Sequence, residues 1–311
     1  MSISRRHFLT GAGLVLATTA TGCRPEAPAF LRRSERRLLQ TLLGMPTTDG
    51  AGVRLHRVIG QPALRNLDPF LLLDRFHSDD PGAYIRGFPD HPHRGFETVT
   101  IMRAGRMRHR DSRGNQGLIQ SGGFQWMTAG RGIVHSEMPE QEDGLMSGFQ
   151  LWVNLPASEK MCEPAYQDLQ PERIASGRIG SHLLEVASGE VEGLVGPVRE
   201  RPTRPLLVYA SLEDDRPLRL DLPEEHTAFL FVAEGEVEVG EERSRVQAGR
   251  LGLLSTGKRL SLRAPTQRSE VLVAAATPLR EPIVQRGPFV MNTEEEIRRA
   301  YADYRAGILG R

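Results

Sequence analysis

Two pairs of potential metal ligands lie in the first half of the chain, and a single residue separates the members of each pair. His91 and His93 lie in the run DHPHRGFETVT, and His135 and Glu137 lie in GRGIVHSEMPE. Successive side chains of a β-strand point to opposite faces, so the members of each pair share a face if their segment is extended. Two neighbouring strands can therefore direct four donors to one point.

Three imidazoles and a carboxylate, without a thiolate, form a donor set that suits Fe, Mn, Cu, Ni or Zn. A single His-x-His is often only an exposed strand face or a satisfied pair in a core. Two such pairs, each in a glycine-rich setting, favour a site for one divalent transition metal.

The spacing of these residues resembles the two sequence motifs of cupins. The first motif is matched by His91, His93, Glu97 and Gly105, with the last gap one residue longer than usual. The second motif is approximated by Gly123, Gly130, Gly132 and His135, with Gly130 where proline is usual.

The longer runs HPHRGFETVT and QWMTAGRGIVHSEMPEQ are more specific and resemble the pirin family, over about residues 49 to 311. That resemblance implies iron, Fe(II), bound by His91, His93, His135 and Glu137, while Mn, Cu, Ni or Zn stay open. It also implies that Glu97 is not a ligand but orients a ligand imidazole.

Composition and internal rhythm agree with an all-β fold. The 311 residues include 32 glycines and 21 prolines, which favours many short strands and turns. Residues 206–277 repeat the strand and glycine-turn rhythm of the first unit, but only His226 lies near a ligand position. We therefore expect a tandem cupin of two β-barrel or jelly-roll domains, the second without metal, with a C-terminal helix.

The first 23 residues are typical of an export signal. Arg5 and Arg6 lie in a run that resembles the twin-arginine motif, followed by an uncharged stretch too short to span a membrane. Cys23 ends a run that resembles a lipobox, which predicts a lipoprotein anchored through Cys23. The alternative is a plain signal peptide, which would give a periplasmic protein. Cys162 would then have no partner and is expected to be a small apolar filler.

Residues 24–48 are expected to be a linker, either a solvated tether or a short amphipathic helix in which arginines alternate with leucines. At the other end, a capping box of Thr293 and Glu296 predicts the start of a helix. Its expected apolar face consists of Ile297, Tyr301, Tyr304 and Ile308, with expected ion pairs Glu294–Arg298 and Glu295–Arg299.

The predicted organisation has five parts. They are the signal (1–23), the linker (24–48), the metal-binding cupin (49–175), the degenerate cupin (176–285) and the tail helix (286–311).

Several residues outside the two pairs allow two interpretations. His56 and His77 are expected on the surface. His109 and Asp111 share a strand face and would lie near the mouth of the site or, as the simpler expectation, on a solvated edge. Phe149 or Trp152 could form the wall of a pocket, but both are expected in the core.

Two functions compete. The resemblance implies a dioxygenase that cleaves quercetin-type flavonols with O₂, in which Glu137 completes the metal shell and takes the proton of the substrate hydroxyl. The alternative is a non-enzymatic metal-binding or redox-responsive protein of the cell envelope. A net charge of +1 gives no reason to expect a nucleic-acid partner, and a membrane contact is expected only through Cys23.

Overall fold

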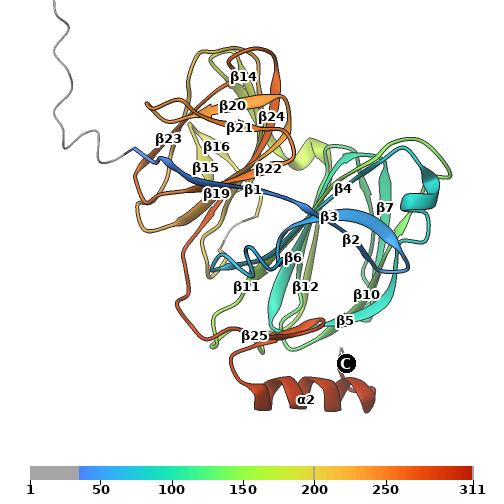
Figure 1. Cartoon of the computed structure of the whole chain (residues 1–311). Coiled ribbons are helices and arrows are strands. Elements are labelled where there is room, and N and C mark those ends of the chain that lie inside the picture. The colour runs from blue at the N-terminus through green and yellow to red at the C-terminus, as the bar shows by residue number, and fades with distance from the viewer. Residues whose placement is uncertain (1–34, 199, 310–311) are drawn as a thin grey trace, which may run out of the picture.

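The computed structural model describes residues 35–198 and 200–309, which form two lobes that lie against each other (Figure 1). The cyan and green lobe contains the strands between residues 45 and 169, and the yellow and orange lobe contains those between residues 175 and 276. The expected signal at 1–23, with Cys23, and the start of the expected linker lie outside the described residues.

The N-terminal lobe is a sandwich of two antiparallel sheets. The larger sheet consists, in spatial order, of β12 (Ala165–Leu169), β9 (Phe124–Thr128), β6 (Phe96–Ala104), β11 (Met146–Asn154), β4 (Phe70–Ser78), β3 (Val53–Ile59) and β2 (Met45–Asp49). The smaller sheet consists of β5 (Phe88–His93), β10 (Ile133–Pro139), β7 (Arg106–Asp111) and β8 (Gln116–Gln120).

The C-terminal lobe repeats this plan of seven strands packed on four. Its larger sheet consists of β1 (Leu38–Leu43), β22 (Arg250–Leu254), β19 (Thr227–Glu234), β24 (Ser269–Ala276), β17 (Leu206–Leu212), β14 (His182–Ser188) and β13 (Ala175–Ile179). Its smaller sheet consists of β18 (Leu218–Asp221), β23 (Arg259–Arg263), β20 (Glu236–Val239) and β21 (Ser244–Gln247). The prediction of an all-β tandem cupin is confirmed.

Short elements connect and extend the sheets. They are the hairpins β15 (Glu190–Val191) with β16 (Leu194–Val195) and β25 (Val284–Arg286) with β26 (Phe289–Met291), the 3-10 turns Pro81–Ala83 and Pro171–Arg173, and the helix α2 (Glu294–Arg305).

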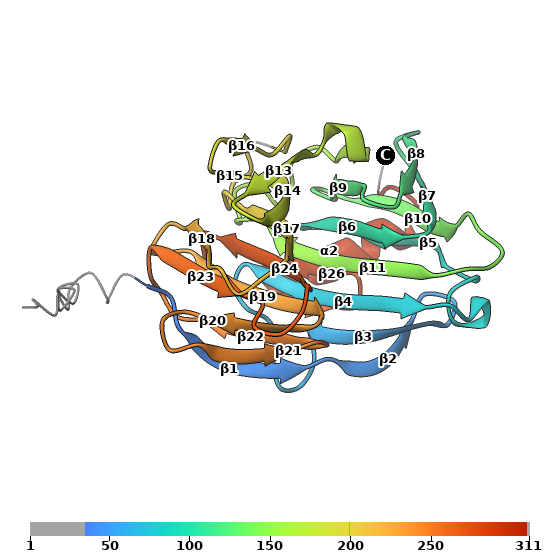
Figure 2. The same cartoon turned by 90° about the horizontal axis from the view of Figure 1, so that it is seen from above.

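The two large sheets pack face to face, and their contact forms a core shared by both lobes (Figure 2). The ring of Phe149 meets that of Phe231 at 5.4 Å between ring centres, and Phe70 meets Phe229 at 5.0 Å. Because side chains alternate along a strand, the same strands that fill this core with one face turn their other face into the N-terminal barrel. This alternation positions the site described below.

The expectation of a linker over residues 24–48 is wrong for the second half of that segment. β1 pairs with β22 of the C-terminal lobe, and β2 pairs with β3 of the N-terminal lobe, so this segment joins both large sheets as an edge strand. Leu42 is buried and Leu39 is exposed, which is a strand alternation and not a helical face. Residues 36–48 therefore belong to the folded body, and the C-terminal cupin includes β1.

Arg36 anchors this segment. Its side chain is fully buried, and its guanidinium donates to the backbone oxygens of Pro223, His226 and Ser255 at 2.7, 2.9 and 2.9 Å. A buried arginine must satisfy its donors inside the protein, and these carbonyls satisfy the two terminal nitrogens but not Nε. The arginine that looked like part of a solvated tether is thus a structural clamp.

The predicted tail helix is α2, and its capping box between Thr293 and Glu296 is confirmed. Ile297 and Ala300 are buried, whereas Tyr304 and Ile308 are 41% and 54% exposed, so only the first half of the expected apolar face packs. Helix α2 lies beneath the N-terminal lobe in Figure 1.

The expected ion pairs of α2 differ in their partners. Arg298 pairs with Glu295, three residues away, and Glu294 pairs with Arg286 on β25. Positions three and four apart are both neighbours on a helix, and the hairpin offers Glu294 a second basic group.

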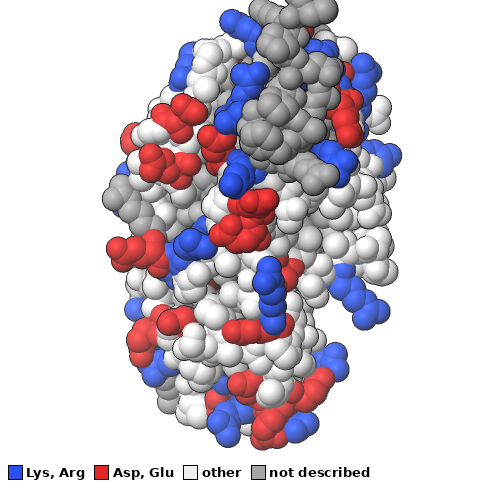
Figure 3. Space-filling view, turned by 90° about the vertical axis from the view of Figure 1, so that its left-hand side faces the viewer, with Lys and Arg blue, Asp and Glu red and all other residues white. Residues whose placement is uncertain are grey.

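Charged side chains of both signs are interspersed on the face of the molecule shown in Figure 3, so neither sign forms a continuous field there. The part of the chain that the structure describes contains no helix long and apolar enough to cross a membrane.

Candidate metal centre

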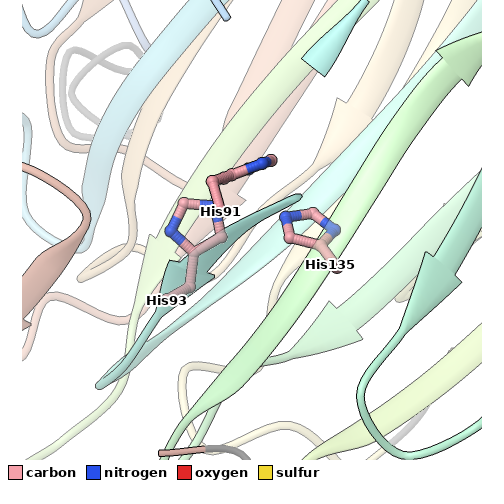
Figure 4. A group of neighbouring side chains, drawn as sticks. All are labelled: His91, His93 and His135. Carbon is pink, nitrogen blue, oxygen red and sulfur yellow. The ribbon is translucent and has the colours of Figure 1, made fainter. Parts of the chain in front are cut away.

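The three histidines predicted as ligands converge from two paired strands. β5 and β10 are antiparallel neighbours, and His91 lies directly opposite His135. The ring of His91 lies 4.7 Å from that of His93 and 4.3 Å from that of His135, measured between ring centres. The rings gather at one point between β5 and β10 (Figure 4), and one nitrogen of each lies within 4.8 Å of the others.

Hydrogen bonds fix which nitrogen each ring presents. Nδ1 of His91 lies 2.8 Å from the carbonyl oxygen of Pro89, and Nδ1 of His93 lies 3.2 Å from that of Pro288. A carbonyl oxygen only accepts, so both Nδ1 atoms carry the proton and both Nε2 atoms keep a free lone pair. Nε2 of His135 is buried without a hydrogen-bond partner.

Burial favours the neutral form of two of these rings. Burial and the neighbouring imidazoles hold the pKa of His93 and that of His135 well below the ordinary histidine value. A metal ligand must be the neutral form of imidazole, and this environment favours that form without a metal.

The residues present therefore fit a divalent transition metal. One nitrogen of each ring lies within 4.8 Å of the others, and the buried Nε2 of His135 has no partner and therefore needs an explanation. Nitrogen donors of this kind suit Fe, Ni, Cu and Zn. The donor set alone does not choose among them.

Glu137 lies two residues beyond His135 on β10 and is almost fully buried. Its two carboxylate oxygens accept hydrogen bonds from Thr100 Oγ1 at 2.7 Å and from Gln150 Nε2 at 2.8 Å. It borders the same cavity as His91 and His93, but it is not part of the cluster of close donor atoms. Its role as a fourth ligand stays a prediction.

His109 and Asp111 form a buried pair behind His135. The expectation that they lie on a solvated edge is wrong. Asp111 lies opposite His135 and His109 lies opposite Glu137, because β7 pairs with β10. His109 Nε2 lies 3.2 Å from Asp111 Oδ2, and its Nδ1 faces Nδ1 of His135 at 3.5 Å. The ring of Tyr166 stacks on His109 at 4.4 Å.

This arrangement supports His135 as a ligand. Burial raises the pKa of Asp111, but hydrogen bonds from His109, Asn115 and nearby backbone N–H groups outweigh it and lower the pKa. An ionised Asp111 fixes the proton of His109 on Nε2, so Nδ1 of His109 accepts from Gln125 Nε2 at 2.9 Å while it lies 3.5 Å from Nδ1 of His135. The repeated spacing of two along 109/111 and 135/137 was the signal that could have identified this group.

The expected role of Glu97 is also wrong. Glu97 is fully buried, but its partners are Thr128 and Arg201, and Arg201 comes from the loop between β16 and β17 of the C-terminal lobe. On β6 its side chain points to the face opposite that of Thr100, because the two positions differ by an odd number. Glu97 therefore ties the lobes together and does not orient a ligand imidazole.

The C-terminal hairpin reaches the site. Pro288, between β25 and β26, supplies the carbonyl that orients His93. β26 passes over Gly95 so closely that a Cβ atom there would lie 2.0 Å from the oxygen of Val290. Lys160 is buried at this crossing and donates to the oxygens of Gly95 and Val290. The tail is therefore part of the wall of the site.

A cavity of about 980 Å³ opens from the histidines. Gln150 and Trp152 project into it from β11, whereas Phe149 points to the core between the lobes. The expectation of a core position is confirmed for Phe149 and wrong for Trp152, which packs on Phe96 at 4.3 Å and forms a wall of the cavity.

The remaining histidines do not join the site. His56 and His77 are exposed, as expected. His226, in the C-terminal lobe, bonds through Nε2 to Thr277 Oγ1 at 3.0 Å. Over residues 35–198 and 200–309, His91, His93 and His135 form the one cluster of three or more such donors. Cys162 is a half-buried free thiol.

Comparison with protein families gives two matches along the chain. The model named Pirin matches residues 52–153, and the model of the pirin C-terminal cupin domain matches residues 207–310. Their division agrees with the two lobes.

Relatives match over most of the chain. A Pseudomonas aeruginosa protein provisionally named quercetin 2,3-dioxygenase is 48% identical over 280 residues, which are 88% of this chain and 98% of that protein. Human pirin is 41% identical over 276 residues, which are 88% of this chain and 93% of that protein. The crystal structure of quercetin 2,3-dioxygenase from Acinetobacter baumannii superposes with a TM-score of 0.81 at 34% identity, covering 88% of this chain and 98% of that one.

Proposed function

The chain belongs to the pirin family, and on that basis we propose that it is a metal-dependent dioxygenase that cleaves quercetin-type flavonols with O₂. The observation that carries the proposal is the convergence of three histidine nitrogens beside a cavity that His91 and His93 line and that is large enough for a three-ring aromatic compound. The names of the Pseudomonas and Acinetobacter proteins support the substrate class.

His91, His93 and His135 would hold the metal, and we propose that Glu137 completes its shell. A bound divalent metal would supply a Lewis acid that lowers the pKa of the flavonol 3-hydroxyl. The metal that we propose for the native protein is Fe(II) or Mn(II), taken up in the cytoplasm, where competing copper and zinc are scarce in free form.

We propose that Glu137 also takes the proton of the substrate hydroxyl. It borders the cavity, and each of its oxygens keeps a lone pair beyond the bonds from Thr100 and Gln150. These two donors hold the carboxylate in one orientation, as a general base requires. The reaction consumes one O₂ and releases one CO per flavonol, and the ring-opened ester keeps the remaining atoms.

The rest of the cavity would orient the substrate. Trp152 and Leu72 provide a flat apolar surface next to the polar Gln150. An aromatic ring on this surface would displace water from the neighbourhood of the reacting carbon.

The test is oxygen uptake and carbon monoxide release by protein reconstituted separately with Fe(II), Mn(II), Ni(II), Cu(II) or Zn(II) and supplied with quercetin. We expect at least one metal to give equal amounts of O₂ consumed and CO released, with no turnover in the His135→Ala variant and normal turnover in the His226→Ala variant. No turnover with any metal would refute the proposal.

A second candidate is a non-enzymatic, redox-responsive binding protein. The observation that favours it is the bond from His93 to Pro288, because a change at the metal would reach the hairpin that carries α2. Under this candidate the reconstituted protein shows no flavonol turnover, and oxidation of the bound metal alters the protease sensitivity of the tail.

We also propose export by the twin-arginine route, followed by a periplasmic location or lipidation at Cys23. The sequence motif alone supports this. Metabolic labelling with a fatty-acid analogue should mark the wild type and not a Cys23→Ser variant, whereas labelling of neither chain would leave a plain signal peptide.

A further inference from the structure

A row of polar side chains crosses the floor of the cavity, away from the histidines. Thr100 on β6 lies opposite Gln150 on β11, Gln150 lies opposite Asp74 on β4, and Asp74 lies opposite Arg57 on β3. Neighbouring strands are about 4.8 Å apart, so Asp74 is roughly 10 Å across the sheet from Thr100, the residue that holds Glu137.

The far end of this row is a buried ion pair. Arg57 donates to both oxygens of Asp74, from Nε at 2.9 Å and from a terminal nitrogen at 2.7 Å. The same terminal nitrogen bonds to Asp49 at 2.8 Å. Asp74 is only 4% exposed, yet it borders the cavity.

The chemistry of this end selects what it can bind. Each oxygen of Asp74 keeps a lone pair after its bond to Arg57. One arginine between two carboxylates leaves a net charge of −1, so the end repels an anionic group and accepts neutral hydrogen-bond donors. Arg65 lies exposed at the rim.

An apolar row runs beside the polar one. Trp152 lies opposite Leu72, two residues along β11 and β4 from Gln150 and Asp74. A flat ring can therefore lie on Trp152 and Leu72 with its edge directed to the polar row. A polar row with an apolar surface alongside it matches a planar aromatic compound with hydroxyl groups at both ends.

We propose that the Asp74–Arg57 pair is a recognition subsite for hydroxyl groups on the ring that lies farthest from the metal-binding oxygens of the substrate. The substrate class is then a planar polyphenol with neutral donors on its pendant ring. The inference rests on the proposed function and adds the feature that discriminates among flavonols.

The test compares three flavonols that differ only on the pendant ring. Galangin has no hydroxyl there, kaempferol has one and quercetin has two. Dissociation constants are measured anaerobically on metal-loaded protein, by quenching of tryptophan fluorescence, for the wild type and for Asp74→Asn. The matched control is Asp80→Asn, which alters an aspartate of an exposed ion pair with Arg54 away from the residues that border the cavity.

We expect each pendant hydroxyl to tighten binding to the wild type, with quercetin at least about tenfold tighter than galangin, as hydrogen bonds to a charged group allow. In Asp74→Asn this preference should largely disappear while the dissociation constant of galangin stays unchanged, which also shows that the variant is folded. Asp80→Asn should match the wild type for all three compounds.

The outcomes separate the two proposals. Equal binding of the three flavonols by the wild type, or a preference that survives in Asp74→Asn, would overturn the subsite while flavonol turnover still supports the dioxygenase. Failure of every flavonol to bind would overturn both. If Asp74→Asn binds none of the three flavonols, the Asp74–Arg57 pair supports the structure of the barrel and is not a recognition subsite.

Discussion

Replacing Lys160 with methionine should remove a pH dependence that the stability of the wild type shows above pH 8. Lys160 is 1% exposed, and its Nζ donates to the oxygens of Gly95, Asn154 and Val290 at 2.7, 2.6 and 3.1 Å. Burial lowers its pKa to about 8, although Glu281 and Glu296 act in the opposite direction.

The direction of the pH dependence follows from whether the folded or the unfolded state holds the lysine proton. Between about pH 8 and pH 10.5 the unfolded chain keeps the lysine proton and the folded protein has lost it, so stability rises with pH in that window. The gap between these two values corresponds to about 3 kcal/mol, fully present above pH 10.5 and lost as the pH falls through 8.

The assay is urea unfolding of metal-loaded protein at several pH values from 7 to 11. The sequence has only two lysines, and the other, Lys258, is exposed, so Lys258→Met is a matched control. We expect the free energy of unfolding of the wild type to gain about 3 kcal/mol over Lys160→Met across the window. A constant difference between the wild type and Lys160→Met, or a loss of the pH dependence in Lys258→Met as well, would refute the reasoning.

Three further predictions concern the metal and the export of the protein. His135→Ala should lose most bound metal by mass spectrometry and His226→Ala should lose none, because only the first ring belongs to the donor cluster; equal content in both variants would mean that the site is assigned wrongly. Asp111→Asn should weaken metal affinity about tenfold or more in a chelator competition, since the asparagine no longer fixes the proton of the ring behind His135, and unchanged affinity would exclude that role. Replacing Arg5 and Arg6 with lysine should retain the protein in the cytoplasm on fractionation, because the recognised feature is the guanidinium pair, and normal export would remove the argument.

The convergence of the three histidines was predictable because the alternation of a strand is a local property. His91 and His93 share a face whatever their surroundings, and so do His135 and Glu137. The same rule, applied to the whole of β6, would have placed Glu97 on the face opposite Thr100. The place of Glu97 in the motif predicts a role beside a ligand imidazole, and the alternation of side chains along β6 excludes that role.

Other features depend on contacts that the sequence does not display. In the sequence, Arg36 is one of several arginines in an expected tether. Its partners are carbonyls of the C-terminal lobe that lie 187 to 219 residues away. The carbonyl of Pro288 that orients His93 lies 195 residues away. No local pattern encodes such pairings, so they require the fold.

The most direct test of the central claim is an anaerobic crystal structure of reconstituted protein with quercetin, with data collected on both sides of the absorption edge of the metal. The account predicts one anomalous peak at bonding distance from Nε2 of His91, His93 and His135, with the flavonol in the adjoining cavity. A peak elsewhere, coordination through Nδ1, or a flavonol bound outside that cavity would contradict it.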